Sequence, residues 1–239
     1  MVVHRPRAQE QLRGHLTVGG PLPHGHRDPQ LLRGQRRQRG RLARARARAA
    51  RLVEQTLRAY GRLDFAVNNA AGGGHLPMPL ADVPVEDYDS AFAVSQRGVF
   101  LSMKYEIPAM LRGGGGSIVN MASTAALHPV AGLAGYASAK FAVVGLTRVA
   151  ALDYAASGVR VNALAPGPIH TEQLDRAGPE GLAKVAAGVP VHRLGRPAEI
   201  AAAAVWLCGA DAGFLTGATI PVDGGLVAGM PPFARGRAG

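Results

Sequence analysis

The 239-residue sequence contains one cysteine, and this scarcity excludes a disulfide within the chain. The residue, Cys208, follows the apolar run at 205–207. A lone thiol in apolar surroundings usually packs as a small hydrophobe, and it fits a reducing compartment. We therefore assign Cys208 no catalytic role and expect a soluble, cytoplasmic protein.

Long apolar runs and clustered metal ligands are also missing. No window reaches the roughly 18 uninterrupted apolar residues that a membrane-spanning helix needs, and the start lacks the apolar core of a secretory signal. Four histidines lie in expected loops without a ligand-spaced partner: His75, His128, His170 and His192. Metal sites need several such side chains at a fixed spacing. We expect neither a membrane span nor a metal site.

Acidic residues are scarce in one part of the chain. Residues 1–51 hold thirteen Arg, no Lys, Ser or aromatic residue, and only two acids, Glu10 and Asp28, which gives a net charge of +11. Residues 52–239 hold fourteen basic and fourteen acidic residues. The formal charge of the whole chain, +11, therefore lies in the first segment, and the remainder is neutral.

The segment 1–51 has too few apolar residues to bury a core, and we interpret it as aberrant or disordered. A helix is expected over Arg41–Tyr60, where good helix formers run without Gly or Pro. Our leading hypothesis is a wrong-frame or mis-started translation, because Arg, Gly, Pro, Ala and His prevail as in a GC-rich gene read out of frame. Reading the upstream and overlapping DNA in the other frames tests this hypothesis.

The same arginines allow two other interpretations. Arg pairs with phosphate, so a basic arm could bind nucleic acid, but aromatic residues for base stacking are missing from this segment. An organelle transit peptide is Arg-rich too, yet the first serine of the chain is Ser90. We therefore expect neither a nucleic acid partner nor a transit peptide.

Residues 52–239 read as one α/β domain, with enough apolar residues for a single sizeable core. Strand-length and helix-length apolar segments alternate, separated by Gly, Pro or Asp. The expected strands are 65–68, 117–121, 160–164 and 219–222, and the expected helices are 88–110, 136–156 and 199–207. This alternation indicates a parallel sheet covered by helices on both faces.

Three residues carry a pattern that suits acid–base chemistry. Tyr136 and Lys140 are four apart, and hence on one face of an expected helix. A nearby ammonium stabilises a phenolate, which lets a tyrosine act as general acid and base near neutral pH. Ser123 follows an expected strand, at the carboxyl end of that strand, where open α/β sheets bind their ligands. Its hydroxyl can hold a substrate oxygen, or it can simply form a turn with Thr124.

Five motifs in order and at matching spacing resemble the classical short-chain dehydrogenase/reductase family. They are Asn68-Asn69-Ala70, the strand ending at Ser123, Tyr136-x-x-x-Lys140, Asn162-Ala-Leu-Ala-Pro166-Gly167 and Val222-Asp223-Gly224-Gly225. The resemblance covers about residues 52–229. It implies an NAD(P)-dependent oxidoreductase that interconverts a secondary alcohol and a ketone, on a Rossmann-like, doubly wound parallel sheet.

The resemblance also implies residue roles. Tyr136 would exchange the proton with the substrate, Lys140 would stabilise its phenolate and bind the nicotinamide ribose, and Ser123 would hold the substrate oxygen. The remaining cofactor contacts would come from Asn69, Ala70 and Ala71 on the adenosine side, and from Pro166, Gly167, Ile169 and Thr171 near the nicotinamide. Residues 172–196 would form a lid over a small or medium secondary alcohol or ketone. The expected assembly is a homodimer or homotetramer formed through the helices 88–110 and 136–156.

Two departures from the family pattern bear on activity. Ser95 stands where the family usually has an Asn that anchors a water in a proton relay, so we expect impaired turnover. The Gly-rich turn that receives the cofactor pyrophosphate at a helix N-terminus is not found in residues 1–51. The sheet is therefore expected to lack or distort its first two βα units. The choice between NAD and NADP stays open, and a non-catalytic relative of the family is the alternative.

Overall fold

The computed structural model describes residues 29–72 and 74–229. The chain divides into two compact units, residues 1–43 and 44–239. Of the first unit, residues 29–43 are described, and they are helical, as the first part of α2 (Pro29–Tyr60). The helix expected over Arg41–Tyr60 is thus present and begins at Pro29. Of the segment 1–51 predicted to be aberrant or disordered, residues 1–28 lie outside the described residues and residues 29–51 are helical, as part of α2. The domain boundary at residue 51 stays a prediction.

The second unit is built on a parallel sheet. Its strands are β1 (Phe65–Asn68), β2 (Gly116–Met121), β3 (Val159–Pro166) and β4 (Thr219–Val222), in that spatial order. Every neighbouring pair is parallel, with Val67 opposite Val119 and Asn120 opposite Ala163. The predicted parallel α/β fold is therefore confirmed. Among the described residues the sheet has these four strands.

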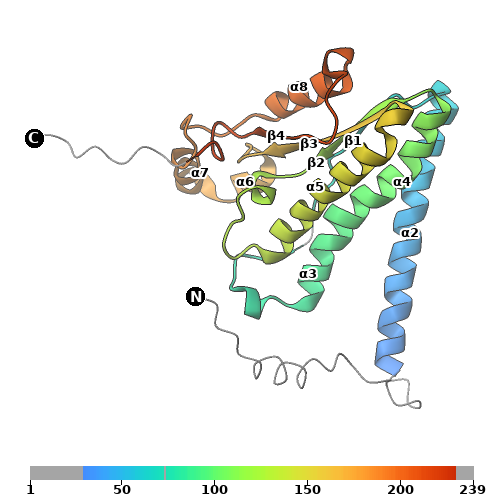
Figure 1. Cartoon of the computed structure of the whole chain (residues 1–239). Coiled ribbons are helices and arrows are strands. Elements are labelled where there is room, and N and C mark those ends of the chain that lie inside the picture. The colour runs from blue at the N-terminus through green and yellow to red at the C-terminus, as the bar shows by residue number, and fades with distance from the viewer. Residues whose placement is uncertain (1–28, 73, 230–239) are drawn as a thin grey trace, which may run out of the picture. The chain divides into compact units, whose positions relative to one another are not determined.

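Helices lie on both faces of this sheet (Figure 1): α4 (Arg97–Arg112) and α5 (Ala134–Tyr154) pack on one face, and α8 (Pro197–Cys208) packs on the other. Further helices of this unit are α3 (Val85–Ala91), which packs against α5, and α6 (Glu172–Asp175) and α7 (Gly178–Ala187), which pack against each other. The helix expected over 88–110 is present within a continuous helical run, in which the π-helical segment Phe92–Gln96 joins α3 to α4. A π turn adds a residue to the helical repeat, which periodicity in the sequence does not reveal.

Two apolar clusters occupy the two faces of the sheet. Along β2, Ile118 belongs to the cluster with α2, α4 and α5, whereas Val119 belongs to the cluster with α8. Both side chains are fully buried. Successive side chains of a strand point to opposite faces, so a strand covered on both sides must be apolar throughout. Cys208 packs at the edge of the α8 cluster, as expected of a small hydrophobe.

Candidate active site

Helix α5 presents Tyr136 and Lys140 as neighbours. The Lys140 Nζ lies 5.8 Å from the centre of the Tyr136 ring, which agrees with their separation of one helical turn. Tyr136 is half-buried, whereas Lys140 is 2% exposed. The predicted pair is therefore brought together, with the ammonium group over the face of the Tyr136 ring.

The lysine is fixed to the end of β2. Its Nζ donates a 2.7 Å hydrogen bond to the Met121 carbonyl oxygen, at the last residue of that strand. Burial lowers the pKa of Lys140 to about 8, because the charged form loses hydration. This bond ties α5 to the carboxyl end of the sheet, two residues before Ser123.

Ser123 lies at that same strand end, with extended backbone and 9% exposure. Its Oγ accepts a 3.1 Å hydrogen bond from the Ala125 amide and so caps the 3₁₀ turn Thr124–Ala126. The structure shows the turn-forming interpretation of this serine, in which Oγ acts as an acceptor. The hydroxyl hydrogen is not used in this bond, and the role of Ser123 toward a substrate oxygen stays a prediction.

Ser95 lies in the π-helical segment, which packs against α5, and it is 1% exposed. π turns inside α-helices often mark functional sites because they shift side chains out of the regular repeat. The structure thus places Ser95 in the element that contacts the helix of Tyr136 and Lys140.

Four of the predicted cofactor residues line one cavity of about 480 Å³: Asn69, Pro166, Ile169 and Thr171. Met121 also lines it, so the cavity reaches the strand end to which Lys140 is bonded. The walls are otherwise apolar, from Val67 on β1 to Val205 on α8. An apolar cavity with a few polar groups suits the flat ring of a nicotinamide. The residues present therefore fit the nicotinamide half of the cofactor.

Three further predicted cofactor residues, Ala70, Ala71 and Gly167, are sequence neighbours of the cavity residues but do not line the cavity. Ala70 and Ala71 are exposed in the loop after β1. Gly167 follows β3, and a Cβ there would lie 2.9 Å from both Cα and Cβ of Asp223. Only glycine allows this approach of the two segments. Gly167 thus supports the backbone turn rather than the cavity wall.

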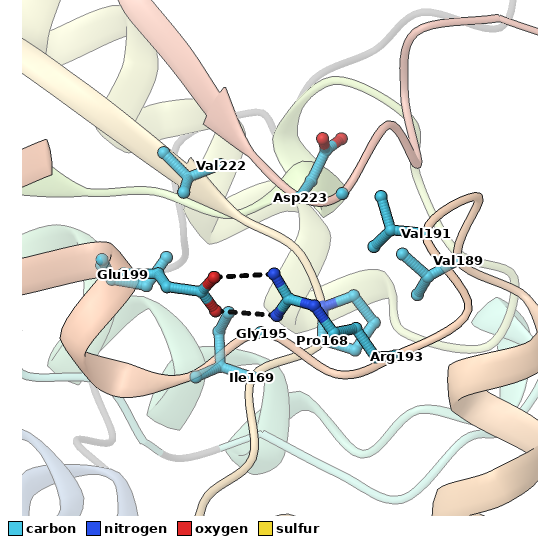
Figure 2. A pocket seen from close by; sticks show the side chains of 11 residues that line it. Pro168, Ile169, Val189, Val191, Arg193, Gly195, Glu199, Val222 and Asp223 are labelled. Carbon is cyan, nitrogen blue, oxygen red and sulfur yellow. Dashed lines mark hydrogen bonds and ion pairs between the residues drawn. The ribbon is translucent and has the colours of Figure 1, made fainter.

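A second, smaller pocket of about 80 Å³ contains an ion pair that sequence reasoning missed (Figure 2). Arg193 donates two hydrogen bonds to the Glu199 carboxylate, 2.7 and 2.9 Å long, and the carboxylate also accepts the Arg196 amide at 2.7 Å. Arg193 lowers the pKa of Glu199 to about 2. These bonds attach the segment 189–196 to the start of α8. The separation of six residues between Arg193 and Glu199 matches no sequence pattern from which this contact could be predicted.

A buried polar chain beneath the site was also missed. The Asn68 amide donates to the Glu106 carboxylate at 3.0 Å and to the Asn120 side-chain oxygen at 2.9 Å, and Asn120 donates to Thr147 Oγ1 at 3.0 Å. This chain of hydrogen bonds joins β1 and β2 to α4 and α5. Glu106 is 6% exposed, and burial raises the pKa of its carboxyl group to about 7. A polar residue in an apolar helix was the available signal in the sequence.

Within residues 29–72 and 74–229, no group of three or more His, Cys, Asp or Glu side chains is placed to hold a metal ion. None of the helices described there is both long and apolar enough to span a bilayer.

Comparison with known proteins places this site in a family. A family model described as enoyl-(acyl carrier protein) reductase matches residues 43–227. The 2,5-dichloro-2,5-cyclohexadiene-1,4-diol dehydrogenase of Sphingobium indicum is 47% identical over 184 residues, which are 74% of this chain and 72% of that protein.

Two solved structures are similar in fold. Levodione reductase has a TM-score of 0.74 at 32% identity, over 77% of this chain and 74% of that one. ElxO with NADP bound has a TM-score of 0.72 at 30% identity, over 77% of this chain and 75% of that one. The match of sequence and fold over the segment that carries Ser123, Tyr136 and Lys140 shows that this chain belongs to the short-chain dehydrogenase/reductase family of oxidoreductases.

Proposed function

We propose that this protein interconverts a secondary alcohol and a ketone by hydride transfer with NAD or NADP, and that Tyr136 is the general acid and base. The carrying observation is the attachment of the Tyr136–Lys140 pair to the end of β2 through the Met121 carbonyl. That carbonyl belongs to a residue lining the cavity that fits a nicotinamide. We propose that proton and hydride transfer take place beside this end of β2.

In the oxidation direction, Tyr136 as phenolate takes the proton of the substrate hydroxyl. The Ser123 hydroxyl donates a hydrogen bond to the substrate oxygen and orients it. A nicotinamide held by Asn69, Pro166, Ile169 and Thr171 would supply the acceptor for the hydride of the carbinol carbon. The proton on Tyr136 then passes to solvent. Lys140 stabilises the phenolate by its charge, and a buried charge acts more strongly than an exposed one.

Asn69, Pro166, Ile169 and Thr171 would hold the nicotinamide half, because they share the cavity. The relative ElxO has been solved with NADP, which supports a nicotinamide cofactor. The residue that selects between NAD and NADP normally lies at the end of a strand ahead of β1.

The substrate we propose is a small or medium secondary alcohol, with ring compounds tested first. The Sphingobium indicum relative is named for a cyclohexadienediol, which supports this choice. The segment 172–196 is the proposed lid, and it comprises α6, α7 and the segment held by the Arg193–Glu199 pair. It carries no cluster of charge that would require a phosphate or carboxylate on the substrate.

A homodimer or homotetramer is part of the proposal. Large apolar side chains are exposed on α4 and α5, the helices that the resemblance places at subunit contacts: Phe100, Phe141, Val149 and Leu152. Exposed apolar side chains grouped on two helices favour association. Sedimentation equilibrium of the wild type and of Leu152→Asp tests this, since a monomer in both cases would contradict it.

The test of the reaction is turnover of the purified 239-residue chain with NAD⁺ and with NADP⁺. Cyclohexanol and related ring alcohols are offered, and the reduced cofactor is followed by its absorbance. We expect cofactor reduction in step with ketone formation. Absence of turnover with both cofactors and every alcohol would overturn the proposal and favour the non-catalytic alternative.

A further inference from the structure

The start of helix α5 receives no cap from its own segment. Its N-cap residue is Leu133, whose side chain makes no capping hydrogen bond. The first hydrogen bond of the helix runs from the Ala137 amide to the Leu133 carbonyl oxygen, at 2.8 Å. Amides in the first turn of a helix have no partner within it, so the amide of Gly135 needs an acceptor from elsewhere.

His75 supplies that acceptor from a distant part of the chain. Its Nε2 accepts a 3.3 Å hydrogen bond from the Gly135 amide, across 60 positions of sequence. Its Nδ1 lies 2.8 Å from the Leu76 carbonyl oxygen. A neutral imidazole has one donor and one acceptor nitrogen, so a proton on Nδ1 satisfies both contacts at once. His75 thus caps α5 at the residue directly before Tyr136.

The surroundings hold the imidazole and the helix start together. The Met78 amide donates a 3.1 Å hydrogen bond to the Gly132 carbonyl oxygen, which ties the segment of His75 to the residues just ahead of α5. Gly135 is buried, and a Cβ there would lie 3.3 Å from the Cβ of Ala91 and 3.6 Å from Cδ2 of His75. The missing side chain lets α3 and the imidazole approach α5 closely. The contact between His75 and Gly135 is therefore part of a packed junction.

The same connection reaches the cavity proposed for the nicotinamide. His75 lies in the connection from β1, which ends at Asn68, to α3, which begins at Val85. Asn69, at the start of this connection, lines the cavity. One connection therefore lines the proposed cofactor cavity through Asn69 and caps the helix of Tyr136 through His75.

We propose that His75 is a positioning residue for Tyr136 and acts through the first turn of α5. By accepting the Gly135 amide, the imidazole fixes the turn that carries the phenol, and so the place of the phenol hydroxyl beside the cofactor cavity. Proton transfer is sensitive to such placement, because a displacement of about 1 Å can cost about a hundredfold in rate. The inference rests on the proposed function, since it concerns the proton that Tyr136 transfers.

The test compares His75→Phe with His75→Gln. Both variants lose the Nδ1 donor that faces Leu76, but the glutamine keeps an acceptor for the Gly135 amide and the phenylalanine does not. With an alcohol that the wild type oxidises, kcat of His75→Phe should fall about tenfold with little change in KM, and kcat of His75→Gln should stay within about twofold of the wild type. Hydrogen exchange of the Gly135 amide, followed by NMR, should be about tenfold faster in His75→Phe and near the wild-type rate in His75→Gln.

The solvent isotope effect separates positioning from a loss of folded protein. A misplaced phenol makes proton transfer slower and more rate-limiting, so the ratio of kcat in H₂O to kcat in D₂O should rise in His75→Phe and not in His75→Gln. A variant that merely folds less well would have a lower kcat and an unchanged ratio.

Equal losses of kcat in the two variants, an unchanged isotope ratio in His75→Phe, or equal exchange at Gly135 in all three proteins would overturn the inference. An active wild type that His75→Phe equals in kcat would overturn the inference alone. A wild type without turnover would overturn the proposed function and the inference with it, so the two failures are distinguishable.

Discussion

Replacing Glu106 by glutamine should stabilise the protein near pH 8 and have little effect near pH 5. The carboxyl group is 6% exposed and accepts a 3.0 Å hydrogen bond from Asn68. Burial raises its pKa from 4.5 to about 7, with the Asn68 bond opposing that rise. A glutamine retains an oxygen for Asn68 and carries no charge at any pH. The substitution thus removes the cost of ionising the buried group.

The sign follows from proton binding. Between pH 4.5 and about 7 the folded protein holds a proton that the unfolded chain has released. The stability contribution of this group is therefore full below pH 4.5 and is lost as the pH rises through about 7. A tenfold change in proton affinity corresponds to ~1.4 kcal/mol. Raising the pKa of Glu106 from 4.5 to about 7 therefore corresponds to about 3 kcal/mol of folding stability that is lost at higher pH. Glu106→Gln should regain most of that amount at higher pH.

Urea unfolding of the wild type and of Glu106→Gln, at about pH 5, 6, 7 and 8, measures the difference. The midpoint of the variant should exceed that of the wild type by about 1 M urea or more near pH 8 and should approach it near pH 5. Glu180→Gln, on the exposed side of α7, is the control and should show no such trend. A difference between Glu106→Gln and the wild type that stays constant across this range would refute the reasoning.

Four further predictions concern the site. In thermal unfolding, Lys140→Met should be more stable than the wild type near pH 7, and this advantage should shrink between about pH 8 and pH 10.5. Burial lowers the pKa of Lys140 from 10.5 to about 8, so between these two values the unfolded chain binds more protons than the folded protein, and the wild type gains stability as the pH rises. Ser95→Asn should raise kcat severalfold, and an unchanged kcat would remove the relay argument. Glu199→Gln should raise KM with little change in kcat, because it weakens the bonds that Arg193 makes to the start of α8; equal losses in both parameters would contradict this. Reduced nicotinamide mononucleotide should support ketone reduction with a kcat/KM within about tenfold of NADH, since the residues present fit the nicotinamide half, and a preference for NADH of about a thousandfold would show a phosphate site outside that cavity.

The sequence predicted the sheet well because each strand is a short apolar run bounded by Gly, Pro or Asp. The bounds of β1 and β4 agree with expectation, and β2 and β3 extend it by one or two residues at an end. Tyr136 and Lys140 were found because helical spacing alone places them together. Such local patterns can be read without knowledge of the tertiary structure.

The missed features depend on contacts between distant segments. The bonds from Asn68 to Glu106 and to Asn120 join residues 38 and 52 positions apart. The π turn at 92–96 arises where this segment packs against α5, and the periodicity of the sequence continues through it. The hydrogen bond from Gly135 to His75 joins residues 60 positions apart. None of these follows from spacing along the chain.

The central claim is that Tyr136 transfers the proton in the oxidation of an alcohol, and Tyr136→Phe tests it most directly. The matched control is Tyr154→Phe, which makes the same change at the far end of α5. With an alcohol that the wild type oxidises, kcat of Tyr136→Phe should fall by about 10² to 10⁴, with cofactor affinity nearly unchanged and the control equal to the wild type. Turnover of Tyr136→Phe equal to that of the wild type would contradict the assignment.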